Sequence, residues 1–343
     1  MTRAGHSRDR LVVLQSIKAL RDTTNPYLVQ LVRSLEGEAE VQLFSWRRAL
    51  FGRWDVLHVH WPELLFLRES RARTIVGAAL CTVLVLRMRL TRRALVRTAH
   101  NIAPHDHRGV LIDAVLGLLD RATTRWLLLN DSTPVPDGAA REVIPHGHYV
   151  DWYARHSVPS PVPRRVLCFG LIRAYKNVPA LVHAFTGMED ATSSLHVVGR
   201  PDPARLAEEL RDAASGDDRV TLSFGYADDE RLVREMGEAS LVALPYRDLH
   251  NSGALLLALS FGRPVLVPEN GPTAALAAEV GEAWVRRYTG ELTAEVLRAA
   301  LAEGVPAGTP DLSRRDWATL GAAHLGAYRS ALSQLRHERR YSE

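Results

Sequence analysis

The sequence predicts an α/β protein made of two Rossmann-like, doubly wound domains that face each other across a cleft. Apolar runs of strand length alternate with helical patterns along the whole chain, as in βαβ units with a parallel sheet. The 343 residues, 46% hydrophobic and 24% charged, are enough for two cored domains. A run with three prolines in eight residues, 156–163, divides the chain into two halves.

The first domain is expected to span residues 1–155 and to begin with a short polar, basic segment. Its strands are predicted at Leu11–Leu14, Val41–Phe44, Val56–Val59, Leu95–Thr98, Trp126–Leu129 and Glu142–Ile144. Helical patterns such as Asn25–Leu35 and Val110–Leu119 lie between several of these strands.

The second domain is expected to span 165–315, after a linker at 156–164, with a last helical segment at 316–343. Its strands are predicted near 166–169, 195–198, 220–224, 241–244 and 264–267, and its helices near 178–186, 203–214, 228–236, 252–260 and 272–279. In doubly wound sheets, ligands bind outside the carboxyl ends of the strands. We therefore expect the functional residues in the loops that follow the strands.

Composition narrows the class of protein. The two cysteines lie in apolar runs and form no CxxC pair, which favours a reducing, cytoplasmic location over a disulfide framework or a zinc site. The net charge of +4 fits an anionic ligand or a membrane face, and without a basic stripe it does not indicate nucleic-acid binding.

The most apolar segment, Thr74–Leu90, has 13 uncharged residues before Arg87 and is flanked by arginines. A spanning helix needs roughly 20 apolar residues, so we do not expect this segment to cross a membrane. Two interpretations remain: a cationic, apolar helix lying on the anionic inner face of the plasma membrane, or a buried crossover helix of the sheet.

The turn from Phe169 to Asn177 (FGLIRAYKN) is the most informative local feature. It joins an apolar strand to a helical pattern, and Gly170 allows the backbone to turn closely around a ligand. Arg173 and Lys176 supply bidentate hydrogen bonding and a point charge beside a helix N-terminus, which suits a diphosphate. An ordinary βα loop with two solvated cations is the alternative.

Other polar motifs follow predicted strands. They are His58–Glu63 (HVHWPE), Thr98–Asp106 (TAHNIAPHD), Ile144–Asp151 (IPHGHYVD), Asn251–Gly253 (NSG) and Gly262–Val265 (GRPV). A single histidine is more often structural than catalytic, but seven within 55–151, mostly on strand-end loops, favour function.

These motifs resemble GT-B-fold bacterial glycosyltransferases over nearly the whole chain. Asp55–His60, Thr98–Asn101, Ile144–Gly147, His196–Gly199 and Val220–Gly225 are similar to strand-end motifs of that family, and Ala258–Val265 to its most specific signature. The combination is most similar to exopolysaccharide enzymes of the xanthan and acetan type. The resemblance implies an acceptor-side first domain, a nucleotide-sugar-binding second domain and a final helix, Trp317–Leu335, that crosses back to the first domain.

The resemblance also implies the reaction, in which a glycan or lipid-linked saccharide hydroxyl attacks a nucleotide sugar and a nucleoside diphosphate leaves. The residues implied to bind the donor, a GDP- or UDP-sugar for example, are Gly170, Arg173, Lys176, Gly199, Tyr226, Asn251, Ser252 and Gly253. His100 would contact the donor sugar. The candidates for the base are Asp106, Glu63 and His105, in that order, since a carboxylate in a polar loop can be desolvated on closure.

The sequence departs from the family at three points. Leucines, Leu249 and Leu257, stand where a pair of glutamates is common, and leucine cannot hold ribose hydroxyls. Arg173 precedes Lys176 by three residues instead of five. No DxD motif is present, so we expect no metal and no cofactor besides the donor.

Two other classes of function stay open. A metal-dependent hydrolase could take its ligands from His58 and His60 together with His100, His105 or His146. The two leucines at the glutamate positions are compatible with a non-catalytic subunit that binds a nucleotide sugar or glycan.

Overall fold

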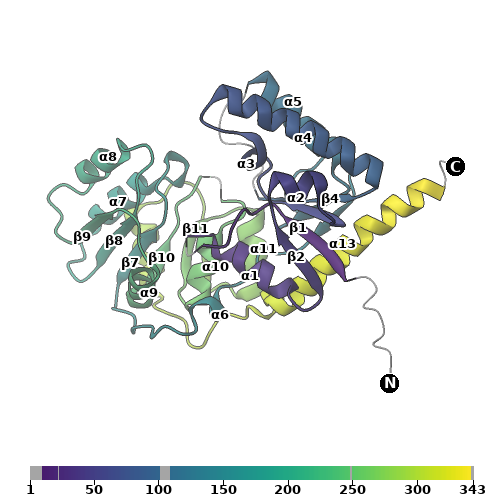
Figure 1. The fold of residues 1–343 in the computed structure, drawn as a ribbon. Coiled ribbons are helices and arrows are strands. Elements are labelled where there is room, and N and C mark those ends of the chain that lie inside the picture. Colours follow the sequence, from purple (N-terminus) through teal and green to yellow (C-terminus); the bar gives the residue numbers. More distant parts are fainter. Residues whose placement is uncertain (1–9, 22, 101–108, 248, 341–343) are drawn as a thin grey trace. The chain divides into compact units, whose positions relative to one another are not determined.

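The computed structural model describes residues 10–21, 23–100, 109–247 and 249–340, and the chain forms two compact units. The first unit contains residues 1–147 and 315–343, and the second contains 148–314. Each unit is built on its own parallel six-stranded sheet, as Figure 1 shows. The prediction of two Rossmann-like, doubly wound domains is confirmed.

In the first unit the strand order is β2-β1-β3-β4-β5-β6. The strands are β1 (Leu11–Gln15), β2 (Ala39–Leu43), β3 (Val56–Val59), β4 (Ala94–Ala99), β5 (Arg125–Leu128) and β6 (Arg141–Val143). The helices are α1 (Pro26–Leu35), α2 (Trp46–Phe51), α3 (Glu63–Phe66), α4 (Arg71–Thr91), α5 (Val110–Ala122) and α13 (Trp317–Arg340).

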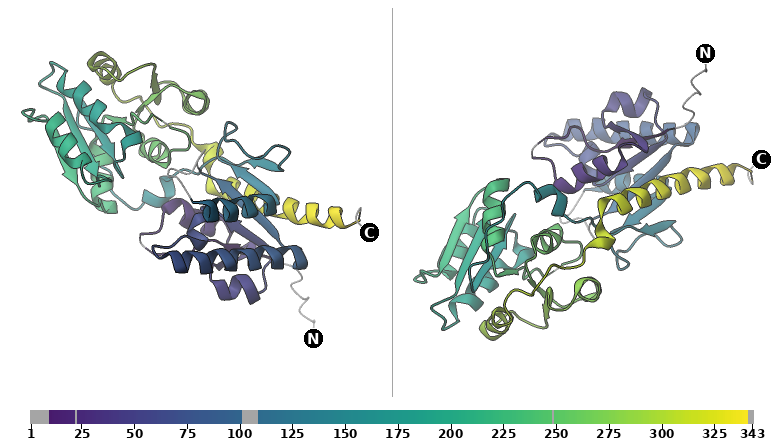
Figure 2. Two further views of the ribbon diagram at one scale, coloured as in Figure 1. Left: turned by 90° about the horizontal axis from the view of Figure 1, so that it is seen from above. Right: turned by 90° about the horizontal axis from the view of Figure 1, so that it is seen from below.

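Alternate residues along these strands pack on opposite faces of the sheet, as strand geometry requires. Val13 and Val56 pack with α1 and α13, while Leu14 and Leu57 pack with α4 and α5. The final helix α13 contacts α1 and β4 and lies along this sheet in both views of Figure 2. It is therefore part of the first unit's core, with Tyr328 fully buried.

In the second unit the strand order is β12-β11-β10-β7-β8-β9. The strands are β7 (Arg165–Phe169), β8 (Ser194–Gly199), β9 (Val220–Phe224), β10 (Leu241–Ala243), β11 (Val265–Pro268) and β12 (Val285–Tyr288). The helices are α6 (Val150–Tyr153), η1 (Ala174–Lys176, a 3₁₀ turn), α7 (Val178–Thr186), α8 (Leu206–Ala213), α9 (Asp229–Glu238), α10 (Gly253–Ser260), α11 (Gly271–Val280) and α12 (Ala294–Ala302). A 3₁₀ turn η2 (Ser313–Arg315) spans the point in the chain where the second unit ends and the first resumes.

Two features of the second unit were not expected from the sequence. Strand β12 and helix α12 were not predicted, although they complete the sheet and its cover. The unit also begins at His148, before the proline-rich run, because Tyr149 and Tyr153 pack into its core beside α9 and α10. The proline-rich run therefore lies inside the second unit.

Both sheets have a point where the chain changes direction across the sheet, and ligands bind at such points in doubly wound folds. In the first unit this point lies between β1 and β3, and in the second between β7 and β10. The loops after these four strands carry most of the residues that the sequence singled out.

Candidate active site

The turn after β7 is held against the end of β8 by a close backbone contact. Gly170 has a φ of +95°, a conformation that favours glycine. A Cβ added to Gly199 would lie 1.8 Å from the carbonyl oxygen of Gly170, so only glycine fits at the end of β8. The amide of Ile172 donates to the carbonyl of Arg200 at 2.9 Å and continues the pairing beyond the strands.

Lys176 lies at the end of this turn with its ammonium group over an aromatic ring. Its Nζ is 4.8 Å from the centre of the Tyr246 ring, on the loop that follows β10. Burial lowers the pKa of Lys176, and among the described residues no carboxylate forms an ion pair with it. A half-buried cation stabilised mainly by a ring face is available to an anionic ligand.

Arg173 differs from Lys176 in its surroundings. Its side chain is 41% exposed, and its Nε lies 3.3 Å from a carboxylate oxygen of Asp202. An exposed ion pair of this kind contributes little to stability, so the guanidinium can exchange Asp202 for a ligand at small cost.

The loop after β10 brings a helix N-terminus to the same edge of the sheet. Ser252 caps α10 by accepting a hydrogen bond from the amide of Leu255 at 3.3 Å, and Gly253 is the first helical residue. Asn251 precedes the cap. The amide of Arg247 donates to the carbonyl of Tyr175 at 2.9 Å, which ties this loop to the turn after β7. Exposed amides at a helix start favour a bound anion.

The structure thus brings together Gly170, Lys176 and Gly199 by direct contact and places Arg173 in the same turn, with Asn251, Ser252 and Gly253 after the neighbouring strand. Tyr226 is different: it follows the edge strand β9, is 76% exposed, and interacts electrostatically with Tyr153. Leu249 and Leu257 are core residues of this unit.

In the first unit, histidines from two strands meet at the carboxyl edge of the sheet. Nδ1 of His60, just beyond β3, lies 3.0 Å from Nε2 of His100, just beyond β4. Nε2 of His58 lies 2.8 Å from the hydroxyl oxygen of Thr98, and the Trp61 ring stacks on His100 at 4.4 Å between centres. These side chains therefore form a largely buried cluster of aromatic and imidazole rings at this edge.

Buried polar residues behind this edge extend the same network. The amide group of Gln15 at the end of β1 lies 3.3 Å from Nε2 of His60 and 3.4 Å from the hydroxyl of Tyr328 on α13. That hydroxyl lies 2.7 Å from Nδ1 of His58. Gln15, His58 and Tyr328 are fully buried.

Burial keeps these imidazoles neutral. It lowers the pKa values of His58 and His60 well below the ordinary value, and neighbouring histidines add to the effect. Burial also lowers the pKa of His100 to about 3 and those of His146 and His324 to about 4. Near neutral pH these side chains are uncharged donors and acceptors of hydrogen bonds.

The sequence analysis missed Gln15 and Tyr328 as members of this group. A signal for Gln15 was present, because it is a polar residue closing an otherwise apolar strand, LVVLQ. Tyr328 lies more than 200 residues from the strands it contacts and carried no local signal.

Of the three candidate bases, the structure describes only Glu63. Asp106 and His105 lie outside the described residues. Glu63 is half-buried in the first turn of α3, near enough to Arg97 to raise the pKa of that guanidinium, although burial lowers it overall. Arg97 itself forms an ion pair with Asp120.

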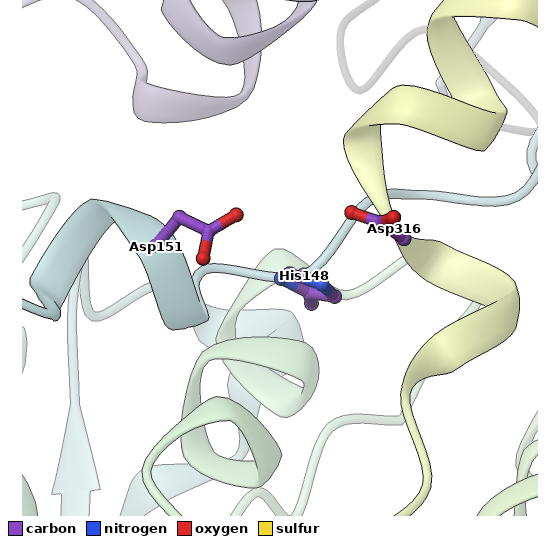
Figure 3. A group of neighbouring side chains, drawn as sticks. All are labelled: His148, Asp151 and Asp316. Carbon is purple, nitrogen blue, oxygen red and sulfur yellow. The ribbon is translucent and has the colours of Figure 1, made fainter.

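A metal site is not assigned to either unit. Figure 3 labels His148, Asp151 and Asp316, of which the first two belong to the second unit and the third to the first. Within the described part of each unit, no three histidine, cysteine or acidic side chains bring ligand atoms within 4.8 Å of one another. Of the histidines proposed above as hydrolase ligands, His58, His60 and His100 instead hydrogen-bond to one another or to neutral partners, and His105 lies outside the described residues.

Helix α4 corresponds to the apolar segment of the sequence, and it is buried on one side only. Cys81, Leu84 and Met88 pack into the core, whereas the opposite side leaves large apolar side chains exposed. We call this exposed side the α4 stripe; it consists of Ile75, Val76, Val83, Leu86 and Leu90, each between 51% and 75% exposed. Among the described helices, α4 alone has the length and apolar composition to cross a membrane, with 39% of its most apolar stretch buried.

Two of the flanking arginines have structural roles. The guanidinium of Arg87 donates to the carbonyls of Ala49 and Gly52, and Arg93 donates to Gly52 and lies over the Trp54 ring at 4.6 Å. Arg89 and Arg92 are exposed.

Comparisons with known proteins identify the class of protein that carries these two edges. A family model of group 1 glycosyl transferases matches residues 163–303, and a curated relative is 41% identical over 97% of the chain. The chain belongs to the group 1 glycosyltransferases. That relative is a "GDP-mannose:glycolipid 4-beta-D-mannosyltransferase" from Xanthomonas campestris pv. campestris, of which 96% is covered.

Solved structures agree on the fold. AviGT4, a glycosyltransferase involved in avilamycin A biosynthesis, matches with a TM-score of 0.62 at 16% identity, over 95% of this chain and 98% of that one. Anabaena HepE in complex with UDP matches with a TM-score of 0.59 at 13% identity, over 97% and 100% of the two chains. The predictions of a GT-B fold and of an enzyme of the hexosyltransferase class are confirmed.

Proposed function

We propose that the protein transfers mannose from GDP-mannose to a glycolipid acceptor in the synthesis of a surface polysaccharide. The 41% identity over nearly the full length of a mannosyltransferase of that specificity supports the donor and the acceptor class. The observation that carries the chemistry is Lys176, a cation held over the Tyr246 ring at the switch point of the second sheet.

In this proposal the second unit stabilises the leaving group. As the bond between mannose and the diphosphate breaks, negative charge grows on the diphosphate. Lys176, Arg173 and the amides at the start of α10 stabilise that charge, and preorganised donors of this kind are often the largest single contribution to catalysis. This arrangement gives donor binding and leaving-group stabilisation without a metal.

The first unit provides neutral hydrogen-bonding groups for the sugar and the acceptor. His100, uncharged at neutral pH, contacts the donor sugar, and its stacking on Trp61 fixes the ring. The base that takes the proton from the acceptor hydroxyl is proposed among Asp106, Glu63 and His105, as the sequence predicts.

A donor panel tests this proposal. Purified protein is titrated with GDP-mannose, GDP-glucose, UDP-glucose and dTDP-glucose while thermal unfolding is followed. A donor at 100 times its dissociation constant stabilises the protein by about 2.7 kcal/mol. We expect this stabilisation with GDP-mannose and mannosyl transfer to a lipid-linked saccharide. Stabilisation by UDP-glucose instead, with no response to GDP-mannose, would contradict the donor assignment.

We also propose that the enzyme works from the cytoplasmic side as a peripheral membrane protein, bound through the α4 stripe. The helix contains no acidic residue, and exposed Arg89 and Arg92 at its end would meet anionic headgroups. Each such cation contributes about 1 kcal/mol near an anionic surface. Binding to the membrane would bring the enzyme close to a lipid-linked acceptor.

Vesicle binding tests the surface. We expect the protein to co-sediment with anionic but not with neutral vesicles, and Leu86→Gln with Leu90→Gln to weaken binding at least about tenfold through lost apolar burial. Arg89→Gln with Arg92→Gln should weaken it at low salt. Arg87 and Arg93 are excluded from the test because they support the fold. Unchanged binding in both double variants would rule out the α4 stripe as the membrane-facing surface.

A further inference from the structure

The hydrogen-bond network behind the first unit's edge has a direction, and that direction fixes where the protons lie. Gln15 is the key because an amide nitrogen only donates and an amide oxygen only accepts. Its Nε2 donates to the hydroxyl of Tyr328 at 3.4 Å, and its Oε1 faces Nε2 of His60 at 3.3 Å. Nε2 of His60 must therefore carry a proton.

The proton on Nε2 of His60 determines the state of His100. A neutral imidazole has one protonated nitrogen, so Nδ1 of His60 is an acceptor. The atom 3.0 Å from it is Nε2 of His100, which must then be the donor. His100, also neutral, is left with Nδ1 as its acceptor.

The other branch of the network obeys the same rule. The Tyr328 hydroxyl accepts from Gln15, which leaves its single proton to be donated to Nδ1 of His58, the other polar atom near it, at 2.7 Å. Nε2 of His58 then carries the proton and donates to the hydroxyl of Thr98 at 2.8 Å. This arrangement satisfies every hydrogen bond described above for this group.

We propose that Gln15 is a positioning residue that sets, through His60, the tautomer of His100, with the proton on Nε2 and the lone pair on Nδ1. In the opposite tautomer, Nδ1 of His100 would be a donor and Nε2 an acceptor, so each nitrogen would have the opposite hydrogen-bonding role. Burying Gln15, His58 and Tyr328 makes the arrangement costly to break, because a lost partner leaves a desolvated polar group. The catalytic consequence rests on the proposed contact between His100 and the donor sugar, whereas the tautomer itself does not.

The first test reads the tautomer directly. In protein labelled with ¹⁵N-histidine, the nitrogen chemical shifts distinguish protonated from unprotonated ring nitrogens, and His100→Gln assigns the signals. We expect wild-type His100 to be protonated on Nε2. Gln15→Met, which removes the acceptor for His60, should give a mixture of tautomers at His100. Thr98→Val, on the other branch, should leave His100 unchanged and serves as the matched control for a lost buried hydrogen bond.

The second test reads the consequence for transfer. Gln15→Met should lower kcat by about tenfold or more while KM for the donor stays nearly constant, since loss of the group that fixes the tautomer of a functional histidine lowers kcat strongly. Gln15→Glu should restore most of the rate, because a buried carboxylic acid that keeps its proton offers the same donor and acceptor pair. In a His100→Ala background, Gln15→Met should cost less than about twofold, because the two residues act as one unit.

The outcomes distinguish the positioning role of Gln15 from the proposed role of His100 in the reaction. A wild-type His100 protonated on Nδ1 overturns the proposal without any variant, and so does a His100 tautomer that Gln15→Met does not change. If the tautomer responds as expected but His100→Ala transfers at the wild-type rate, the positioning by Gln15 stands and the proposed role of His100 in the reaction falls.

Discussion

The candidate functional edges of the two units differ in charge. The first unit gathers buried imidazoles that are neutral, while the second places half-buried Lys176 and the more exposed Arg173 on a turn beside a helix N-terminus. A diphosphate leaving group needs positive charge, whereas a sugar hydroxyl needs directed hydrogen bonds without charge. Under the proposed function, this difference suits the second unit to the diphosphate and the first unit to the sugar and acceptor hydroxyls. It predicts different responses to pH, to mutation and to chelation.

The largest expected effect is acid unfolding of the first unit. Its buried histidines have pKa values below the ordinary 6.5, so the unfolded chain binds more protons than the folded one between pH 6.5 and about 4. Their stabilising contribution is complete above pH 6.5 and is lost as the pH falls. At pH 5.5 each such histidine costs about 1.4 kcal/mol, which for several of them is comparable to a whole domain's stability.

The chain offers a reporter in each unit. Cys81 is buried in the first unit and Cys168 in the second, and both are free thiols. Between pH 7 and 5.5, labelling by 4,4′-dithiodipyridine in moderate urea should accelerate far more at Cys81 than at Cys168. His324→Gln should reduce this pH dependence, and His337→Gln, at an exposed position, should not. Equal acceleration at both thiols would contradict the comparison.

The acid prediction rests on a pattern that was present in the sequence but spread over distant segments. Val56, His58 and His60 alternate along one face of β3, and Val96, Thr98 and His100 do the same along β4. Strand periodicity therefore predicted which side chains share a face, and the resemblance to a known family predicted that His100 matters.

The sequence could not predict how deeply particular side chains are buried or which distant residues they contact. Nothing local to Tyr328 indicates that α13 buries its hydroxyl beside His58, since that contact joins residues 270 positions apart. Strand β12 was missed because VRRY carries two arginines, which an edge strand accommodates through ion pairs and backbone acceptors at its rim. Likewise, the two cations of the turn after β7 looked equivalent in the sequence, and only the structure distinguishes half-buried Lys176 from exposed Arg173.

The next largest expected effect is the loss of activity when the charge of Lys176 is removed, compared with that of Arg173. Lys176→Met keeps most of the side-chain packing against Tyr246 but removes the charge. We expect kcat to fall by about 100- to 1000-fold, in line with the loss of one preorganised donor to developing charge, and affinity for GDP to fall as well. Arg173→Ala should have a smaller effect, because Arg173 is exposed and already shares its charge with Asp202.

Steady-state kinetics and calorimetric titration with GDP measure both variants. Arg205→Ala is the control, since Arg205 is exposed in the same unit and, among the described residues, forms an ion pair only with Glu209 one helical turn away. Near wild-type turnover of Lys176→Met would remove the diphosphate from this turn. A larger loss in Arg173→Ala than in Lys176→Met would reverse the ranking that burial predicts.

The smallest expected effect is that of chelation. The second unit supplies fixed positive charge from Lys176, Arg173 and the start of α10, and the sequence has no DxD motif to hold a metal on the diphosphate. We therefore expect activity after dialysis against EDTA to stay within about twofold of the untreated enzyme, since protein donors fill the role a metal would have. Added Mg²⁺ should also fail to rescue Lys176→Met, because the described residues of the second unit bring together no three metal-ligating side chains that could hold the ion where the ammonium was. Complete loss of transfer in EDTA, restored by Mg²⁺ or Mn²⁺, would show instead that the cationic turn only binds the donor and that a metal stabilises the leaving group.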